Sequence, residues 1–163
     1  EQIQLRVDKY ATVSYQAIVK DYCVEYKLRA RRTKLPRTQV SSSLVAADAV
    51  RTLYGDDIYI YETVFLLLLD RSLTTNGYVM ISKGGISGSI IDKRLVCKYA
   101  VDSLSSSVIL VHNHPSGNLT PSHSDRNICK EITESLATFG IQVSDFLILT
   151  ADGYLSFRDE GYM

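Results

Sequence analysis

The sequence predicts an α/β or α+β domain in which helices cover a mixed β-sheet. Short runs of β-branched, aromatic and leucine residues alternate with longer runs whose apolar residues recur at helical spacing, in the order β-β-α-β-α-β-β. Helices inserted between strands favour a mixed sheet with helical cover. Apolar residues make up 45% of the 163 residues and charged residues 22%, which is the ordinary balance of a globular protein.

The first forty residues are predicted to form an N-terminal extension. Apolar and polar residues alternate from Tyr22 to Leu28, which predicts an added edge strand. The run from Lys27 to Arg37 contains six basic residues and no acidic one, and we interpret it as a solvated linker. Ser41 to Ser43 offer N-caps for a helix from about Leu44 to Tyr54. We therefore expect an extension over residues 1–40 and a domain over residues 41–163.

The first half of the domain is predicted to contain a strand pair, a helix and a third strand. A strand from Ile58 to Leu69, buried on both faces, should pair with Tyr78 to Ser82 across a turn at Asp70 to Gly77. After a glycine-rich loop, five apolar residues recur at helical spacing. They are Leu95, Val96, Tyr99, Ala100 and Leu104. A short apolar strand from Ser107 to Val111 follows.

The helix of the second half has the clearest start and stop signals. Thr120 is its predicted N-cap, Pro121 its first residue and Gly140 its stop. Five apolar residues form one stripe along it: Ile128, Cys129, Ile132, Leu136 and Phe139. Two further strands, Ile141 to Thr150 and Tyr154 to Arg158, should flank a turn at residues 152 and 153.

Two histidines stand where the third predicted strand ends. His112 and His114 are two positions apart, so the pleat of a strand directs both imidazoles to the same side. Pro115, Ser116 and Gly117 end the strand directly afterwards, which leaves the histidines at an open rim. The pair therefore predicts a catalytic metal site, since such a site keeps one position for water.

Asp125 is the expected third ligand. It precedes Ile128, Cys129 and Ile132 by three, four and seven positions, so it shares their inward stripe. A carboxylate on a buried face needs a cation or hydrogen bonds, and two histidines, one aspartate and a water are the usual set of a hydrolytic zinc site. An alternative stays open, in which Asp125 only favours the helix dipole and Ser122 or Ser124 caps the helix.

These residues resemble two related families. The run from His112 to Gly117, His-Asn-His-Pro-Ser-Gly, with Ser122 and Asp125, matches the JAMM or MPN metalloprotease motif H-x-H-x7-S-x2-D at every position. From about Ser41 to Tyr162 the chain resembles the RadC-like family, whose HNHPSG and TPS-x-x-D runs stand at residues 112–117 and 120–125. The resemblance implies a JAMM/MPN-type mixed sheet covered by helices, similar in architecture to the cytidine deaminases.

The resemblance also implies roles for named residues. Zn²⁺ would be held by His112, His114 and Asp125. The JAMM pattern requires a glutamate on an earlier strand, and Glu62 matches it, although without the motif it would be an exposed residue at a strand's start. Glu62 would be the general base for a zinc-activated water, and Ser122 would donate a hydrogen bond to the oxyanion. The implied reaction is hydrolysis of an amide bond in a peptide or protein, by a metallopeptidase or isopeptidase.

Some residues depart from these patterns. Where the RadC-like family has Asp-His after the final helix, this chain has Asp145-Phe146. His123 falls inside the motif but is expected to be exposed and without a metal role. The letters His-Asn-His also occur in HNH nucleases, which need downstream ligands, but no histidine follows His123. Zinc deaminases need H-x-E and P-C-x-x-C, and neither pattern is present.

Charge and composition limit the partners. Eighteen basic and eighteen acidic residues cancel, so any nucleic-acid binding would be local to the run from Lys27 to Arg37. This run, with the DNA-repair association that the RadC resemblance implies, leaves a DNA-associated accessory protein as one alternative function. A metal-bearing scaffold without turnover is another.

The cysteines and the hydropathy bear on location. Cys23, Cys97 and Cys129 show no paired spacing, which predicts reduced thiols. The longest apolar run, Val64 to Leu69, is too short to cross a bilayer, and the start shows no signal-peptide pattern. We therefore expect no membrane partner and a cytoplasmic location.

Overall fold

A computed structural model of the chain describes residue 25, residues 29–84 and residues 91–163. Two compact units divide the chain, Glu1–Arg32 and Thr33–Met163, and the helices and strands below all belong to the second unit. The edge strand predicted from Tyr22 to Leu28 lies outside the described residues except for Glu25. Within the described part of the chain, no helix is both long and apolar enough to span a membrane.

In the described residues, five strands form one mixed sheet. They are β1 (Thr63–Leu69), β2 (Thr75–Lys83), β3 (Ser107–Asn113), β4 (Gln142–Leu149) and β5 (Tyr154–Ser156). Their order in the sheet is β2-β1-β3-β4-β5. The central strands β3 and β4 run parallel, and the three other neighbouring pairs are antiparallel. The predicted mixed sheet is therefore confirmed.

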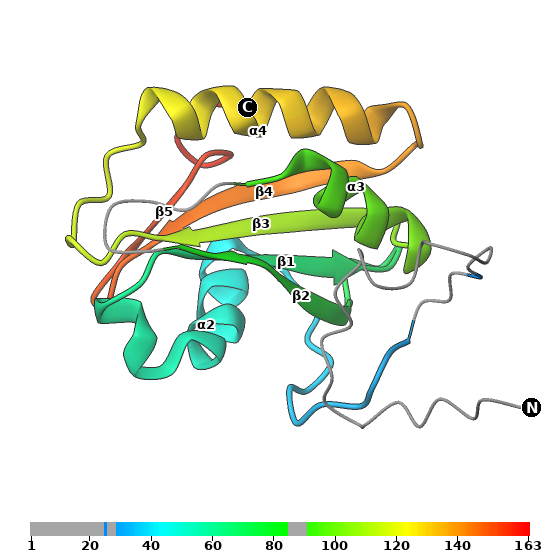
Figure 1. Cartoon of the computed structure of the whole chain (residues 1–163), viewed down its shortest axis with the longest axis horizontal. Coiled ribbons are helices and arrows are strands. Elements are labelled where there is room, and N and C mark those ends of the chain that lie inside the picture. Colours follow the sequence, from blue (N-terminus) through cyan, green and yellow to red (C-terminus); the bar gives the residue numbers. More distant parts are fainter. Residues whose placement is uncertain (1–24, 26–28, 85–90) are drawn as a thin grey trace, which may run out of the picture. The chain divides into compact units, whose positions relative to one another are not determined.

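Helices cover both faces of this sheet (Figure 1). The helix α2 (Ser43–Tyr54) packs on one face, and α3 (Lys93–Asp102) and α4 (His123–Ala137) pack on the other. A short 3-10 helix, η1 (Gly55–Tyr59), connects α2 towards β1. We refer to the two sides of the sheet as the α2 face and the α4 face.

The central strands divide their side chains between these two faces. All seven residues of β1 are buried, as they are in β3, because each strand has a neighbour on both sides and helices above and below. In β3, Val108 and Leu110 join the core on the α4 face, whereas Ile109 and Val111 join the core on the α2 face. The same alternation places His112 on the α4 face and Asn113 on the α2 face.

Several predicted boundaries are wrong, and two of them lie next to the residues predicted for the site. The strand predicted from Ile58 begins only at Thr63, because the carbonyl oxygen of Asp57 accepts hydrogen bonds from the amides of Ile60 and Tyr61 and holds this stretch in η1 and its following turn. Glu62 therefore precedes the strand instead of lying in it. The helix predicted to start at Pro121 with Thr120 as its N-cap starts instead at His123, because Ser122 is the N-cap and its Oγ accepts a hydrogen bond from the Asp125 amide.

Three of the apolar residues predicted to be inward are exposed. Phe139 is 58% exposed because α4 already ends at Ala137, and the helical period no longer applies beyond that point. Leu104 is 88% exposed for the same reason, since it follows the end of α3. Leu95 lies within α3 but is 38% exposed, and Val96 and Ala100 supply the buried side of that helix.

The last residues of the predicted extension contact the domain. The Arg37 guanidinium donates hydrogen bonds to Asp70 Oδ2 at 2.8 Å and Asn76 Oδ1 at 2.9 Å, Gln39 forms a β-bridge with Thr74, and Val40 is buried in the core on the α2 face. Arg37 is therefore tied to the domain through Asp70 and Asn76, although its side chain stays 65% exposed.

Candidate metal centre

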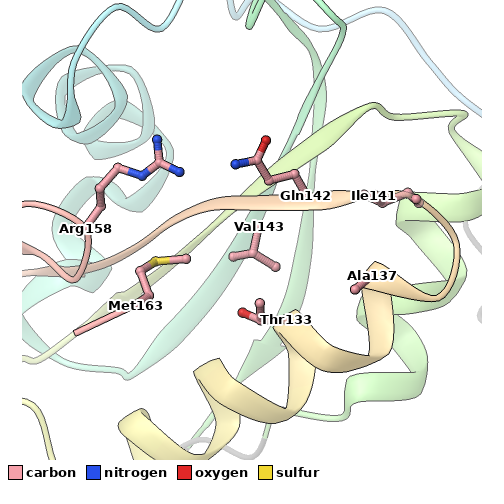
Figure 2. A pocket seen from close by; sticks show the side chains of 8 residues that line it. Thr133, Ala137, Ile141, Gln142, Val143, Arg158 and Met163 are labelled. Carbon is pink, nitrogen blue, oxygen red and sulfur yellow. The ribbon is translucent and has the colours of Figure 1, made fainter. Parts of the chain in front are cut away.

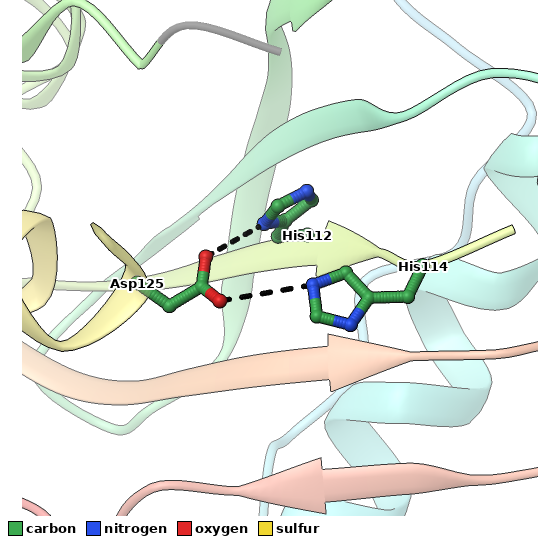
Figure 3. A group of neighbouring side chains, drawn as sticks. All are labelled: His112, His114 and Asp125. Carbon is green, nitrogen blue, oxygen red and sulfur yellow. Dashed lines mark ion pairs between the residues drawn. The ribbon is translucent and has the colours of Figure 1, made fainter. Parts of the chain in front are cut away.

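His112, His114 and Asp125 lie together where β3 ends on the α4 face (Figure 3). One nitrogen or oxygen from each residue lies within 4.8 Å of the others. His112 Nδ1 is 3.3 Å from Asp125 Oδ1, and His114 Nε2 is 3.8 Å from Asp125 Oδ2. Atoms bound at ~2.0–2.2 Å to one tetrahedral ion lie roughly 3.4 Å apart, so these separations suit a shared zinc ion.

The start of α4 fixes the position of Asp125. Ser122 is the N-cap, and its Oγ accepts a hydrogen bond from the Asp125 amide at 3.1 Å. In return, Asp125 Oδ2 accepts from the Ser122 amide at 2.8 Å and from its hydroxyl at 2.6 Å. This reciprocal capping box confirms that Ser122 caps the helix. It leaves Oδ1 of Asp125 facing His112, so capping and metal binding are compatible.

His112 provides the clearest sign that a charged partner belongs here. Its side chain is only 7% exposed, and neither ring nitrogen has a hydrogen-bond partner. Nδ1 faces Asp125 Oδ1 at 3.3 Å, and Nε2 faces Glu62 Oε2 at 3.5 Å. Buried polar atoms are nearly always hydrogen-bonded, and an ion is one of the few explanations when they are not. The residues present therefore fit a bound metal ion.

The tautomer of His114 supports the same conclusion. Its Nδ1 lies 2.6 Å from the carbonyl oxygen of Asn118. A carbonyl can only accept, so Nδ1 carries the proton, and in the neutral ring Nε2 keeps its lone pair. Nε2 faces the Asp125 carboxylate and lies 3.8 Å from Oδ2 (Figure 3). A hydrogen bond to the second ring nitrogen is the usual way in which proteins orient a metal-binding histidine.

The charge of Asp125 completes the electrostatics of the site. Burial alone would raise the pKa of its carboxyl, but the nearby His112 ring and the hydrogen bonds from Ser122 outweigh this and lower the pKa to about 2. Asp125 is therefore ionised at neutral pH although it is only 5% exposed. The centre thus offers two imidazole nitrogens and one carboxylate to a cation, which is the donor set of a catalytic zinc site.

Glu62 lies beside this group and not in it. Its side chain is 24% exposed, and Oε2 approaches the far nitrogen of His112 from the segment that precedes β1. His123, by contrast, is exposed on α4, where its Nδ1 contacts Asn127 Nδ2 at 3.0 Å. The structure therefore brings all five residues predicted for the site together and leaves the third histidine outside.

Two asparagines that contact this region were not among the residues predicted for the site. Asn118 orients His114, and Asn113, between the two histidines, is fully buried. The only signal in the sequence was that Asn113 stands inside the motif run, because the contacts of both residues depend on the tertiary fold.

A cavity of about 430 Å³ lies elsewhere, between the C-terminal part of α4 and the beginning of β4 (Figure 2). Its lining includes Thr133, Ala137, Val143 and Arg158, and none of the five predicted site residues belongs to it. The candidate metal centre is therefore not part of this cavity.

Comparison with known proteins shows the family of this chain. A family model described as RadC-like JAB domain matches residues 40–162. A UPF0758 protein of Flavobacterium johnsoniae is 41% identical over 101 residues, which are 62% of this chain and 44% of that protein. A UPF0758 protein of Finegoldia magna is 37% identical over 134 residues, 81% of this chain and 60% of that protein. The chain thus spans about half the length of the curated relatives that it matches. Since the family model covers most of its length, the chain belongs to the RadC-like JAB domain family.

Proposed function

We propose that this domain is a zinc-dependent hydrolase that cleaves an amide bond, as a metallopeptidase or isopeptidase does. The observation that carries the proposal is the buried His112, whose two unsatisfied nitrogens stand between the carboxylates of Glu62 and Asp125. His112, His114 and Asp125 would hold the zinc. When bound, zinc would lower the pKa of water towards ~7 and polarise a substrate carbonyl.

Glu62 is the proposed general base. Its carboxylate is close to the ligand group but partly exposed, so it can reach a water molecule at the rim of the site. It would accept a proton as the water oxygen attacks the carbonyl carbon, and would pass the proton to the amine as the C–N bond breaks. The products are then a carboxylic acid and an amine, with Glu62 returned to its starting state.

Ser122 is the proposed donor to the oxyanion. Its hydroxyl now donates to Asp125 Oδ2, which also accepts from the Ser122 amide. If the hydroxyl turned towards a substrate, the amide would still hold that oxygen. Ser122 is an exposed residue at the N-terminus of α4, where the helix dipole also favours negative charge. A donor of this kind is typically worth ~3 kcal/mol in the transition state.

The proposed partner is a peptide or protein substrate. Binding of DNA through the run from Lys27 to Arg37 remains the alternative, and the exposure of Arg29, Arg31, Arg32 and Lys34 favours it. Arg37, however, pairs with Asp70 of the domain itself. DNA binding that weakens steeply with salt, and that is lost when the four exposed residues are neutralised, would support this alternative.

The test combines metal analysis with a cleavage screen. Purified protein should contain about one zinc ion per chain, because His112, His114 and Asp125 supply three ligands. The same preparation should be incubated with an unbiased peptide library, and new termini identified by mass spectrometry, with chelator-treated protein as the control. Zinc without cleavage would favour a metal-bearing scaffold, and absence of zinc would contradict the proposal.

A further inference from the structure

We propose that Asn113 is a positioning residue that holds Glu62 against His112. This inference rests on the proposed function, since it concerns the placement of the general base. Asn113 stands between the two histidines in the sequence, but the pleat of β3 directs it to the α2 face, away from the metal centre. It therefore cannot act on the ligands directly through its side chain.

Within the described residues, every hydrogen bond of the Asn113 side-chain amide goes to the segment that carries Glu62. Oδ1 accepts from the Thr63 amide at 2.7 Å. Nδ2 donates to the carbonyl oxygens of Ile58 and Tyr61, both at 3.0 Å. Glu62 is thus bracketed, because the residues directly before and after it are both bonded to one buried side chain. Asn113 itself is 0% exposed, so water does not compete for these bonds.

The bonds also explain why an asparagine suits this position. The last backbone pair between β1 and β3 is Val64 with His112, so Thr63 would face Asn113 next. At this position the Asn113 side-chain oxygen, and not a backbone carbonyl, accepts the hydrogen bond of the Thr63 amide. Its NH₂ group donates to the carbonyl oxygens of Ile58 and Tyr61, which precede β1. Only an amide offers one acceptor and two donors in this arrangement, because an aspartate would present an oxygen to both carbonyls.

Two further bonds hold the same segment from other sides. The Gly84 amide donates to the Glu62 carbonyl at 2.8 Å, and the Tyr54 hydroxyl lies 3.1 Å from the Thr63 carbonyl oxygen. Neither of these replaces the bonds to Tyr61 and Thr63 that Asn113 makes. Loss of Asn113 should therefore free the backbone on both sides of Glu62 while β1 stays paired.

The first test is Asn113→Ala in the zinc-loaded protein, assayed on a substrate from the cleavage screen. We expect kcat to fall by ~10- to 100-fold, as for other residues that orient a catalytic group, with KM and zinc content unchanged. Asn113→Ser can donate one hydrogen bond where Asn113 donates two, so it should show an intermediate loss. It also keeps the test valid if the alanine variant does not fold. Asn127→Ala, which changes an exposed asparagine on α4, is the matched control and should keep full activity.

A double-mutant cycle separates positioning from a general structural effect. If Asn113 acts through Glu62, then Asn113→Ala should cause no further loss of rate in the Glu62→Gln background. Amide hydrogen exchange gives a readout that is independent of turnover, and the Thr63 amide should lose protection in Asn113→Ala while the Val111 amide keeps it.

The outcomes distinguish this inference from the proposed function. Normal kcat in Asn113→Ala, an equal loss in both backgrounds, or loss of zinc in that variant would each overturn the role of Asn113. If wild-type protein binds zinc but cleaves nothing, the proposed function fails instead. Exchange then decides whether Asn113 places Glu62: loss of protection at Thr63 supports the inference, and unchanged protection overturns it.

Discussion

Two buried aspartates of this domain, Asp125 and Asp145, show how little burial alone says about a carboxylate. Each is 5% exposed. Both carboxylate oxygens of Asp145 accept hydrogen bonds. Oδ1 accepts from the backbone amides of Phe146 and Arg158, and Oδ2 accepts from the Ser156 hydroxyl. Asp125 receives bonds from Ser122 on one oxygen only, and its other oxygen faces a histidine.

The pKa values of the two aspartates shift in opposite directions. Burial raises the pKa of Asp145, and the hydrogen bonds from Ser156, Arg158 and Phe146 only partly offset this. The pKa of Asp125 is lowered to about 2 despite burial, because the nearby His112 ring and the hydrogen bonds from Ser122 both favour the ionised form. Two carboxyl groups that are equally buried therefore differ in pKa according to the groups around them, and a histidine contacts only the one with the lowered pKa.

The largest expected effect concerns Glu62, the proposed general base, which faces the other ring nitrogen of His112 from Asp125. Glu62→Gln should keep zinc, fold and substrate binding but lower turnover by ~100- to 10,000-fold, because an amide cannot accept the proton of water. Turnover, zinc content and melting temperature should be measured on the same preparation. Full turnover in this variant would show that Glu62 is not the base, and loss of zinc would make it a ligand.

The next effect concerns the metal itself. His114→Ala and Asp125→Asn should each reduce zinc from about one ion per chain to far below stoichiometry, because either change leaves only two protein ligands. Elemental analysis after dialysis measures this. His123→Ala is the matched control, since that histidine is exposed and contacts Asn127. Unchanged zinc in His114→Ala would rule out the proposed ligand set.

Replacing Asp145 should lower stability and leave zinc content unchanged, in contrast to replacing Asp125. Asp145→Ala leaves the Ser156 hydroxyl and two backbone amides without their acceptor, so it should lower the free energy of unfolding by about 1–3 kcal/mol for each donor that stays unsatisfied. Urea denaturation measures the loss. Zinc content should not change, and a variant that lost zinc at normal stability would remove the distinction between the two aspartates.

The smallest effect is the pH dependence that Asp145 contributes. Its folded pKa lies above the ordinary value of 3.8, so the folded protein binds more protons than the unfolded chain between these two values. Its contribution to stability should therefore fall as pH rises through that window and stay constant above it.

Asp145→Asn cannot ionise and should lack this contribution. The difference in unfolding free energy between Asp145→Asn and the wild type should shift in favour of the variant as pH rises above 3.8, and then level off. Zinc-free protein, unfolded in urea from about pH 3.5 to about pH 7, provides the measurement. A difference that does not depend on pH would mean that burial does not raise the pKa of Asp145.

Much of the fold was predictable because its elements carry strong local patterns. The leucine-rich strand β1 and the apolar β3 are buried on both faces, as continuous apolar runs predict. The ends of elements were less predictable, since Ile58 suits a strand by composition but lies in a 3-10 helix held by a backbone bond to Asp57. The exposed Phe139 shows the same limit, because a period says nothing about where a helix ends.

The sequence by itself determined which side chains share a direction. Two histidines at the end of a strand share a face through the pleat, and Asp125 lies on the inward stripe of α4, since both relations depend only on local periodicity. Tertiary structure decided which of these directions meet. Glu62 reaches His112 because β1 pairs with β3 in the register that sets Val64 opposite His112. From the other face of the sheet, Asn113 forms hydrogen bonds with Tyr61 and Thr63, the residues on either side of Glu62. Register and burial arise from contacts between distant segments, so no local pattern encodes them.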